Sequence, residues 1–196
     1  MGKVLRISHS LLLAGLLLLL TTGCRLRQRG VPRPEGDMRM ERMDTLYRPF
    51  SSSFPLTFEV PSQVRVEQEE SAPAWINLAY SSYGATLWCT YVSLRNVDRE
   101  ALFAEGRDLV YVHAAKASSI TAQEYTDEER QVYAVLYRLT GEVATPLQFT
   151  ITDSLSYLFR GALYFDESVR TDSVAPLIEY ITDDVRHLIE TIQPQE

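Results

Sequence analysis

Residues 145–165 constrain the fold most, because their pattern predicts two antiparallel strands joined by a tight turn. In the first half, apolar Leu147, Phe149 and Ile151 alternate with polar residues, as in a strand that buries one face. Asp153 and Ser154 follow as turn formers, since their short side chains can bond the nearby backbone. The second half continues as a return strand to residue 165. We therefore expect a β-hairpin with one apolar and one polar face.

A glycine interrupts the return strand of this hairpin at Gly161. Glycine weakens a strand, so its presence inside one usually marks a bulge or the close approach of another element. We expect one of these two features at Gly161.

Further strands and two helices are expected around the hairpin. Extended segments are predicted at 38–43, 56–60, 63–66, 74–80, 85–92 and 132–139, separated by proline, serine or glycine. Asp98 is expected to cap a helix that runs to about Ala117, and Ser173 to cap a second, with Pro176 tolerated in its first turn. The first helix carries the stripe Leu102, Gly106, Leu109 and His113, and the second carries Leu177, Ile181, Val185, Leu188 and Ile192.

This order of elements predicts an α+β fold with a single domain over residues 38–196. The sheet should be mainly antiparallel with about six to eight strands, and both helices should pack on one of its faces, which would bury their apolar stripes. By fold analogy alone, the order of strands and helices is similar to the Mog1/PsbP-like class, whose members commonly serve as assembly factors.

The N-terminus predicts a lipoprotein signal peptide over residues 1–23. Lys3 and Arg6 precede an apolar run of about ten residues, which is too short to span a bilayer. Cleavage is expected between Gly23 and Cys24, so that acylated Cys24 becomes the first mature residue. Thr21 departs from the usual Leu, Val or Ile three residues before the cysteine. The alternative is an ordinary signal peptide with an incidental cysteine.

Residues 24–37 are expected to form the lipidated cysteine and a flexible tether, with two prolines, two glycines and no apolar period. Four arginines in the tether could touch anionic headgroups, although a solvated linker is the simpler role: Arg25, Arg27, Arg29 and Arg33.

The charge balance excludes nucleic acid as a partner. The 196-residue chain has 19 basic and 26 acidic residues, and loss of residues 1–23 leaves 17 basic residues and a net charge of about −9. The two cysteines, Cys24 and Cys89, cannot form an intramolecular disulfide if Cys24 is acylated. Cys89 lies in an apolar strand with no adjacent cation, so a buried structural thiol is expected.

The sequence predicts neither a metal site nor a cofactor site. His113 lies on a core-facing helical stripe, where a hydrogen-bonded histidine is expected. His187 follows Asp183 and Asp184 at helical spacing, but two ligands do not make a zinc site, so a helix-surface acid–base pair is the preferred interpretation. Residues 127–129 are expected to be a solvated acidic turn. No phosphate-binding loop, nucleophile elbow or HExxH sequence occurs, and no catalytic residue is assigned.

The polar face of the hairpin is the candidate partner-binding patch. Arg160 on the return strand should lie near Gln148 and Thr150 on the other strand, where the three side chains would form an exposed polar patch. The alternative is a local ion pair of Arg160 with Asp153 or Glu167.

Several segments together carry a family resemblance: 146–149, Asp153 with Ser154, 159–165, Asp184, and 187–190. They resemble the gliding motility lipoprotein family GldD of the Bacteroidota. The resemblance implies a role in gliding motility and the associated type IX secretion machinery, with Cys24 as the attachment site for acyl chains such as palmitate. Surface lipoproteins of these bacteria typically carry an acidic run after the cysteine. The basic tether therefore implies the periplasmic side of the outer membrane.

Two hypotheses for function follow. In the first, the protein is a non-enzymatic accessory lipoprotein that contacts motility or secretion proteins of the envelope, with membrane lipid bound through Cys24. In the second, it is a periplasmic enzyme or ligand-binding module that acts on peptidoglycan, lipid or a small molecule, with carboxylates or Arg160 in a cleft.

Overall fold

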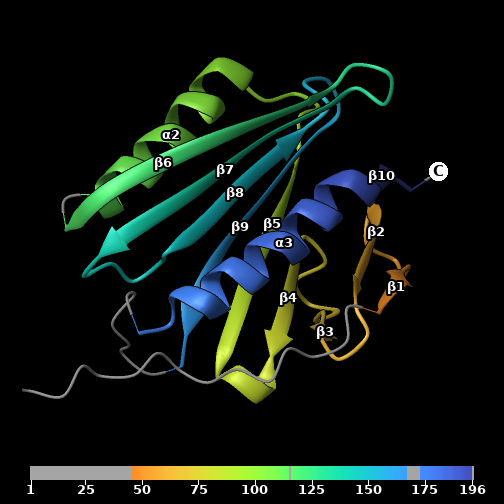
Figure 1. Ribbon diagram of the computed structural model, residues 1–196. Helices are drawn as coiled ribbons and strands as arrows, with labels where there is room; N and C mark the ends of the chain where they lie inside the picture. The colour runs from red at the N-terminus through yellow and green to blue at the C-terminus, as the bar shows by residue number, and fades with distance from the viewer. Residues whose placement is uncertain (1–45, 115, 167–172, 196) are drawn as a thin grey trace, which may run out of the picture. The chain divides into compact units, whose positions relative to one another are not determined.

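Seven antiparallel strands form the main sheet of this protein, whose computed structural model describes residues 46–114, 116–166 and 173–195. The strand order is β3-β4-β5-β9-β8-β7-β6 (Figure 1). The strands are β3 Arg65–Glu67, β4 Trp75–Tyr80, β5 Ala85–Ser93, β6 Ala117–Asp127, β7 Val132–Gly141, β8 Leu147–Thr152 and β9 Tyr157–Phe165. The described residues belong to one compact unit, Gly36–Glu196. The predicted α+β class with a mainly antiparallel sheet is confirmed.

A second, three-stranded sheet lies beside the C-terminal helix. It consists of β1 Tyr47–Phe50, β2 Leu56–Pro61 and β10 Gln193–Pro194, with β2 in the middle. The sequence predicted β2 but neither of its partners. The strand expected at 38–43 lies outside the described residues.

The predicted hairpin is present as β8 and β9, paired from Gln148–Ala162 to Thr152–Leu158. Its turn is held by Asp153, whose Oδ1 accepts hydrogen bonds from the backbone N–H groups of Leu155, Ser156 and Tyr157. Ser154 has φ 65°, a left-handed conformation that favours turn-forming residues. The turn predicted from Asp153 and Ser154 is therefore confirmed.

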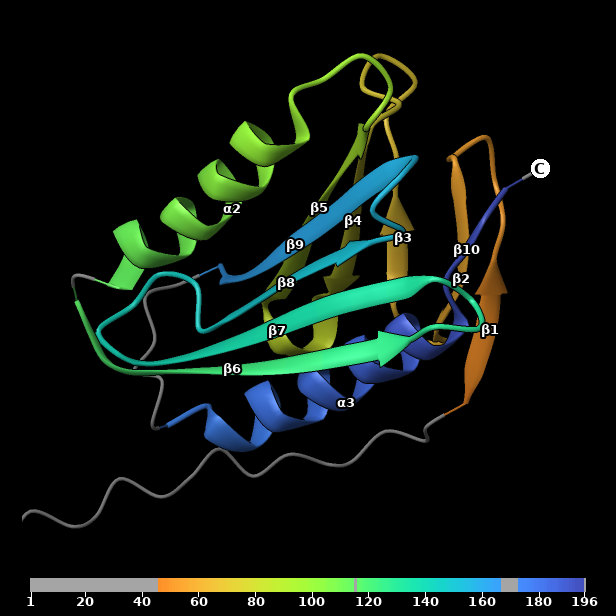
Figure 2. The same cartoon turned by 90° about the horizontal axis from the view of Figure 1, so that it is seen from above.

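The two helices lie on opposite faces of the main sheet, as Figure 2 shows, so the prediction of one shared face is wrong. Helix α3, Ala175–Thr191, covers the face that bears Phe149 and Leu163, and its predicted stripe is buried. Helix α2, Arg99–Ala114, covers the other face, and none of its residues 99–108 is buried. The physical reason is that α3 occupies the mainly apolar face, while the other face combines polar side chains with enough aromatic ones to be covered by α2.

The helix starts agree with the sequence at one of two sites. Asp98 caps α2, since its Oδ1 accepts a hydrogen bond from the Ala101 N–H. Ser173 does not cap α3: the residue before the helix is Val174, which makes no side-chain cap. Pro176 lies in the first turn as expected, where its missing N–H costs little.

The glycine in β9 allows an aromatic ring to lie against the sheet. A Cβ at Gly161 would lie 2.4 Å from Phe149 Cε1 and 3.1 Å from Cys89 Sγ. Phe149 in turn packs on Phe159, with ring centroids 5.6 Å apart, at the centre of the apolar core. The predicted close approach at Gly161 is therefore confirmed.

Gly161→Ala should destabilise the protein by about 1–3 kcal/mol, because the new methyl group overlaps the ring of Phe149, which is buried and packs on Phe159. The measurement is the free energy of unfolding by urea. In the Phe149→Leu background, Gly161→Ala should lower the free energy of unfolding by less, because the clashing ring atoms are absent.

Gly106→Ala in α2 is the matched control. A Cβ there meets no atom within 4 Å, so this change should stabilise the helix by about 0.5–1 kcal/mol. A Gly161→Ala protein as stable as wild type would contradict the packing described for β9.

Candidate functional site

A cavity of about 1030 Å³ lies between α2 and the face of the main sheet opposite α3. Its volume is at the upper end of the range for small-molecule sites. The sheet contributes side chains from β5, β6, β7, β8 and β9, and α2 contributes the opposite wall. The lining includes Trp88, Thr90, Gly106, Tyr133, Thr150 and Arg160.

Arg160 lies near the middle of the cavity floor, and the strand register places a threonine on each side of it. Thr90 of β5 is its cross-strand partner on one side, and Thr150 of β8 on the other. Directly opposed side chains in an antiparallel pair have Cβ atoms about 4.5–5.5 Å apart. Thr90 and Thr150, each with a hydroxyl group, therefore flank Arg160 on the sheet.

The guanidinium group of Arg160 is not satisfied by the protein. Its Nη1 atom is buried and has no hydrogen-bond partner. Within residues 46–114, 116–166 and 173–195, its side chain makes no hydrogen bond or ion pair. Arginine stays charged in proteins, so it cannot escape the cost of burial by losing its proton. This group is the strongest indication of a ligand on the cavity floor.

The residues of the predicted polar patch therefore lie together in the structure, but helix α2 covers them. Gln148, Thr150 and Arg160 all line the cavity. Gln148 is only 8% exposed, and its amide donates a hydrogen bond to Thr145 Oγ1 over 2.7 Å. Their expected exposure to solvent is wrong for Gln148, because α2 lies over this face. Their contact with a partner protein stays a prediction.

The alternative for Arg160, an ion pair with Asp153, does not occur. The carboxylate of Asp153 accepts hydrogen bonds from backbone N–H groups of the turn and from the Ser156 hydroxyl. The second suggested partner, Glu167, lies outside the described residues.

Helix α2 leaves room for a ligand where Gly106 faces the cavity. Leu102 and Phe103 line the same wall and are only half-buried, so the predicted stripe borders the cavity instead of a packed core. A Cβ at Gly106 would meet nothing within 4 Å. Leu109 and His113, also predicted on this stripe, have side chains outside the described part of the structure.

Aromatic residues mark the mouth of the cavity. Trp88, Tyr133 and Tyr164 line it, yet they are 50%, 37% and 38% exposed. They come from three different strands, and the sequence analysis did not single them out. The sequence pattern could have identified them, because each lies at a polar-face position of a strand. A large aromatic side chain is unexpected there if the face is open to solvent.

A separate polar cluster lies on the other side of the main sheet, around α3. Asp184 is 4% exposed and accepts hydrogen bonds from the hydroxyl groups of Tyr47, at 2.9 Å, and Tyr80, at 3.1 Å. Burial raises the pKa of Asp184 to about 6, against the lowering effect of these two hydrogen bonds. The cluster joins β1, β4 and α3, so its first role is structural.

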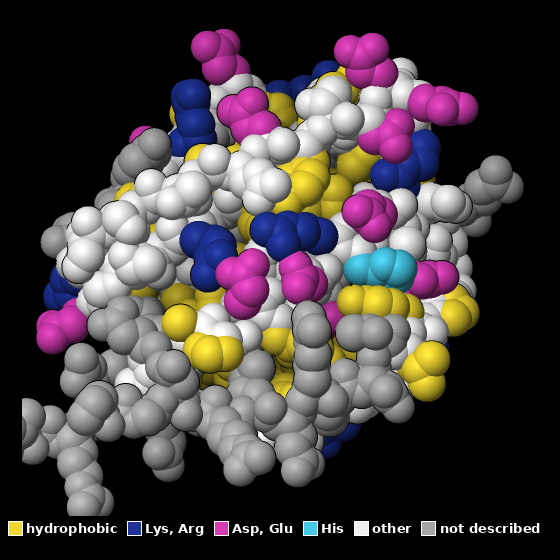
Figure 3. Space-filling model, viewed as in Figure 1, with side chains coloured by type: hydrophobic (Ala, Val, Ile, Leu, Met, Phe, Trp, Pro, Cys, Tyr) yellow, Lys and Arg dark blue, Asp and Glu magenta, His cyan; other side chains and the backbone are white. Residues whose placement is uncertain are grey.

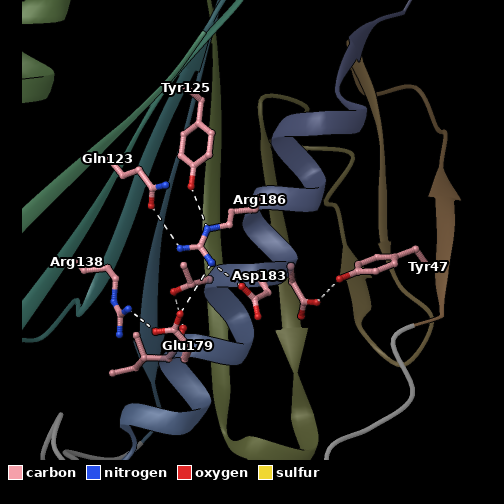
Figure 4. A network of polar contacts seen from close by, with 10 residues as sticks. Tyr47, Gln123, Tyr125, Arg138, Glu179, Asp183 and Arg186 are labelled. Carbon is pink, nitrogen blue, oxygen red and sulfur yellow. Dashed lines mark hydrogen bonds and ion pairs between the residues drawn. The ribbon is translucent and has the colours of Figure 1, made fainter. Parts of the chain in front are cut away.

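Neighbouring charged groups on α3 bind the edge of the sheet. Arg186 donates hydrogen bonds to Asp183 Oδ1, to the Tyr125 hydroxyl at 3.0 Å and to the Gln123 side chain (Figure 4). Arg138 of β7 pairs with Glu179 in the same network. Basic and acidic side chains consequently lie side by side in the middle of this face (Figure 3).

His187 contacts a different element from the one predicted. Its Nε2 lies 2.6 Å from Glu59 Oε2 of β2, and its ring stacks on Tyr47 with centroids 3.7 Å apart. The expected surface pair with Asp183 or Asp184 is wrong, because Arg186 and the two tyrosines occupy those carboxylates. Among the residues that the structure describes, no group of three metal-ligating side chains comes together.

The remaining predicted sites concern the cysteines and the membrane. Cys89 is buried and free, and burial raises its pKa, so the predicted structural thiol is confirmed. Gly23 and Cys24 lie outside the described residues. Within the described part of the chain, the helices are too short or too polar to span a bilayer.

Comparison with protein-family models identifies the family of the chain. The family model described as gliding motility lipoprotein GldD matches residues 27–193, which is most of the chain and nearly all of it after the predicted lipidation site. No curated protein matches the chain.

The raised pKa of Asp184 predicts how stability depends on pH. Below the unfolded pKa of about 3.9, folded and unfolded chains both hold the proton. Between that value and about 6, the folded protein binds more protons than the unfolded chain, so stability should fall as pH rises, by up to about 3 kcal/mol. Asp184→Asn cannot titrate, so its stability relative to wild type should increase from pH 4 to pH 7.

Urea unfolding of both proteins across this pH range is the measurement. Tyr80→Phe removes a hydrogen bond that lowers the Asp184 pKa, so it should extend the fall in stability to higher pH. A constant difference between wild type and Asp184→Asn from pH 4 to pH 7 would contradict the assignment.

Proposed function

We propose that this chain, which belongs to the gliding motility lipoprotein GldD family, is a lipid-anchored accessory protein that acts through protein contacts in the periplasm. It would support gliding motility and the type IX secretion machinery associated with it. The observation that carries the proposal is the family match over residues 27–193. The proposed role is non-enzymatic.

The proposed anchor is the acylated Cys24 at the outer membrane. Gly23 and Cys24 stand at the end of the signal-like segment, and the family is one of lipoproteins. The two or three acyl chains of a bacterial lipoprotein give a stable anchor, at ~0.8 kcal/mol per buried CH₂. The basic tether that follows supports an orientation toward the periplasm.

The proposed protein-contact surface is a pair of exposed tryptophans on β4 and β5. Trp75 is 59% exposed and Trp88 is 50% exposed. Trp75 pairs with Thr90, and Asn77 pairs with Trp88, so both indole rings lie on the same face in diagonal positions. Tryptophan is enriched among residues that dominate binding energy at protein interfaces. We name Trp75 and Trp88 the tryptophan pair.

One observation favours the second hypothesis, a ligand-binding module, and it is the cavity under α2. The two proposed surfaces meet at Trp88, which lines the cavity, whereas Trp75 is not among the cavity-lining residues. A protein of this kind can hold a ligand under α2 and a partner on β4 and β5.

In-cell cross-linking followed by purification and mass spectrometry tests the accessory role. Wild type should capture motility or secretion proteins of the envelope. Trp75→Ala should reduce their yield by about tenfold or more, the effect of losing a central aromatic contact. Cys24→Ala should lose them as well, because the unanchored protein no longer meets its partners at the membrane.

Leu155→Ala is the matched control, since Leu155 is 58% exposed but lies in the β8–β9 turn, away from the tryptophan pair. It should capture the same proteins as wild type and support gliding to the same extent. If wild type captures no motility or secretion protein, the accessory role is wrong. If Trp75→Ala captures them as well as wild type does, the contact surface lies elsewhere.

A further inference from the structure

We propose that the cavity between α2 and the main sheet binds an anionic amphiphile, a molecule with one carboxylate or phosphate head and an apolar body. Arg160 would hold the head group, and the aromatic and aliphatic walls would hold the body. This inference goes beyond the proposed accessory role and does not depend on it.

The proposal of an anionic ligand follows from the unpaired positive charge of Arg160. Its Nη1 is buried without a hydrogen-bond partner, and the group carries a fixed positive charge. A buried charge is costly unless it is paired and hydrogen-bonded. The planar guanidinium group can pair with a carboxylate or a phosphate through two parallel hydrogen bonds, which fits either head group.

The surroundings of Arg160 favour an anionic head group at its own position. The flanking hydroxyl groups of Thr90 and Thr150 can donate further hydrogen bonds to an anion. Glu124 on β6 lies in the same cross-strand row, but the two strands β8 and β7 separate it from Arg160. That corresponds to about 14 Å at the usual strand spacing, which is too far for an ion pair. Glu124 is exposed, and neither it nor Glu100 on α2, the other acidic residue in the cavity lining, forms an ion pair with Arg160.

The walls favour an apolar body attached to this head group. Tyr133, Val135 and Leu158 line the sheet side, and Leu102 and Phe103 line the helix side. Two walls face one another across open space, because Gly106 carries no side chain to fill the gap. An apolar chain or ring system bound in the cavity would remove the apolar surface of these walls from contact with water.

Entry to the cavity is open on the side of the exposed aromatic residues. Trp88 and Tyr164 line the cavity and are about half and one-third exposed, so they reach both the interior and solvent. Tyrosine and tryptophan combine an apolar ring with a polar O–H or N–H group. Such residues suit an entrance through which an amphiphile passes with its head group first.

The test uses the full, lipidated chain in nanodiscs of neutral phosphatidylcholine. The probe is a palmitate analogue that carries a photoreactive diazirine and an alkyne, and it is compared with its methyl ester, which has the same body without the charge. After illumination, mass spectrometry identifies the labelled peptides. We expect saturable labelling of peptides from α2, β8 and β9, at least tenfold stronger for the acid than for the ester.

Two variants separate the head-group site from the body site. Arg160→Gln should remove the preference for the acid, and Arg160→Lys should restore part of it. Gly106→Trp should fill the cavity and abolish labelling by both probes, whereas Gly106→Ala should not. Arg138→Gln, which removes an arginine on the other side of the main sheet, is the matched control and should leave labelling unchanged. Thermal melting of each variant shows that the fold is kept.

Competitors then define the chemistry. Unlabelled palmitate and lysophosphatidate should each displace the probe, and their relative potency distinguishes a carboxylate head from a phosphate head. Displacement by glucuronate or inorganic phosphate alone would overturn the requirement for an apolar body. Equal labelling by acid and ester, or acid preference unchanged in Arg160→Gln, would overturn the proposal. Loss of partner capture in Trp75→Ala with normal labelling would show that the two functions are separate.

Discussion

The packing of α3 on the apolar face of the main sheet is the interaction on which the rest of the structure depends. The Phe149 ring lies close to Gly161 and packs on Phe159, and both rings belong to the apolar core that includes the helix. The stripe of α3 fills that layer completely, since Leu177, Ile181 and Val185 are at most 1% exposed. No room remains there for a second helix.

Helix α2 must therefore use the opposite face, whose composition is mixed. Threonines, Gln148 and Arg160 alternate in the register with aromatic side chains, so this face cannot form a dry core. The helix lies over it with a cavity in between, which a glycine at position 106 keeps open. The two faces of the sheet therefore differ: the apolar face forms the packed core with α3, and the mixed face forms the cavity under α2.

Two charged groups on opposite sides of the main sheet, Asp184 and the half-buried Arg160, differ in how the protein accommodates their charge. Asp184 is satisfied by two tyrosine hydroxyl groups, and burial moves its pKa to about 6, so the protein can neutralise it. Arg160 has neither a partner nor access to a neutral state. The first arrangement is complete within the protein, whereas the second leaves Arg160 Nη1 without a partner, which is the basis for the proposed anionic ligand. For a lipoprotein of the GldD family, the proposed ligand site and the proposed tryptophan pair would place two binding functions in one small domain.

The sequence by itself determined the hairpin, its Asp153 turn, the close contact at Gly161, the burial of Cys89 and the stripe of α3. These features depend on neighbouring residues along the chain or on a regular spacing of apolar residues, and both are visible in the sequence. The family resemblance also came from the sequence, and the family match confirms it. Only the tertiary structure decided the faces on which the helices pack, the Glu59 partner of His187 and the cavity around Arg160. Each of these joins residues far apart in the chain, and burial of a polar group depends on what covers it, which local pattern does not specify.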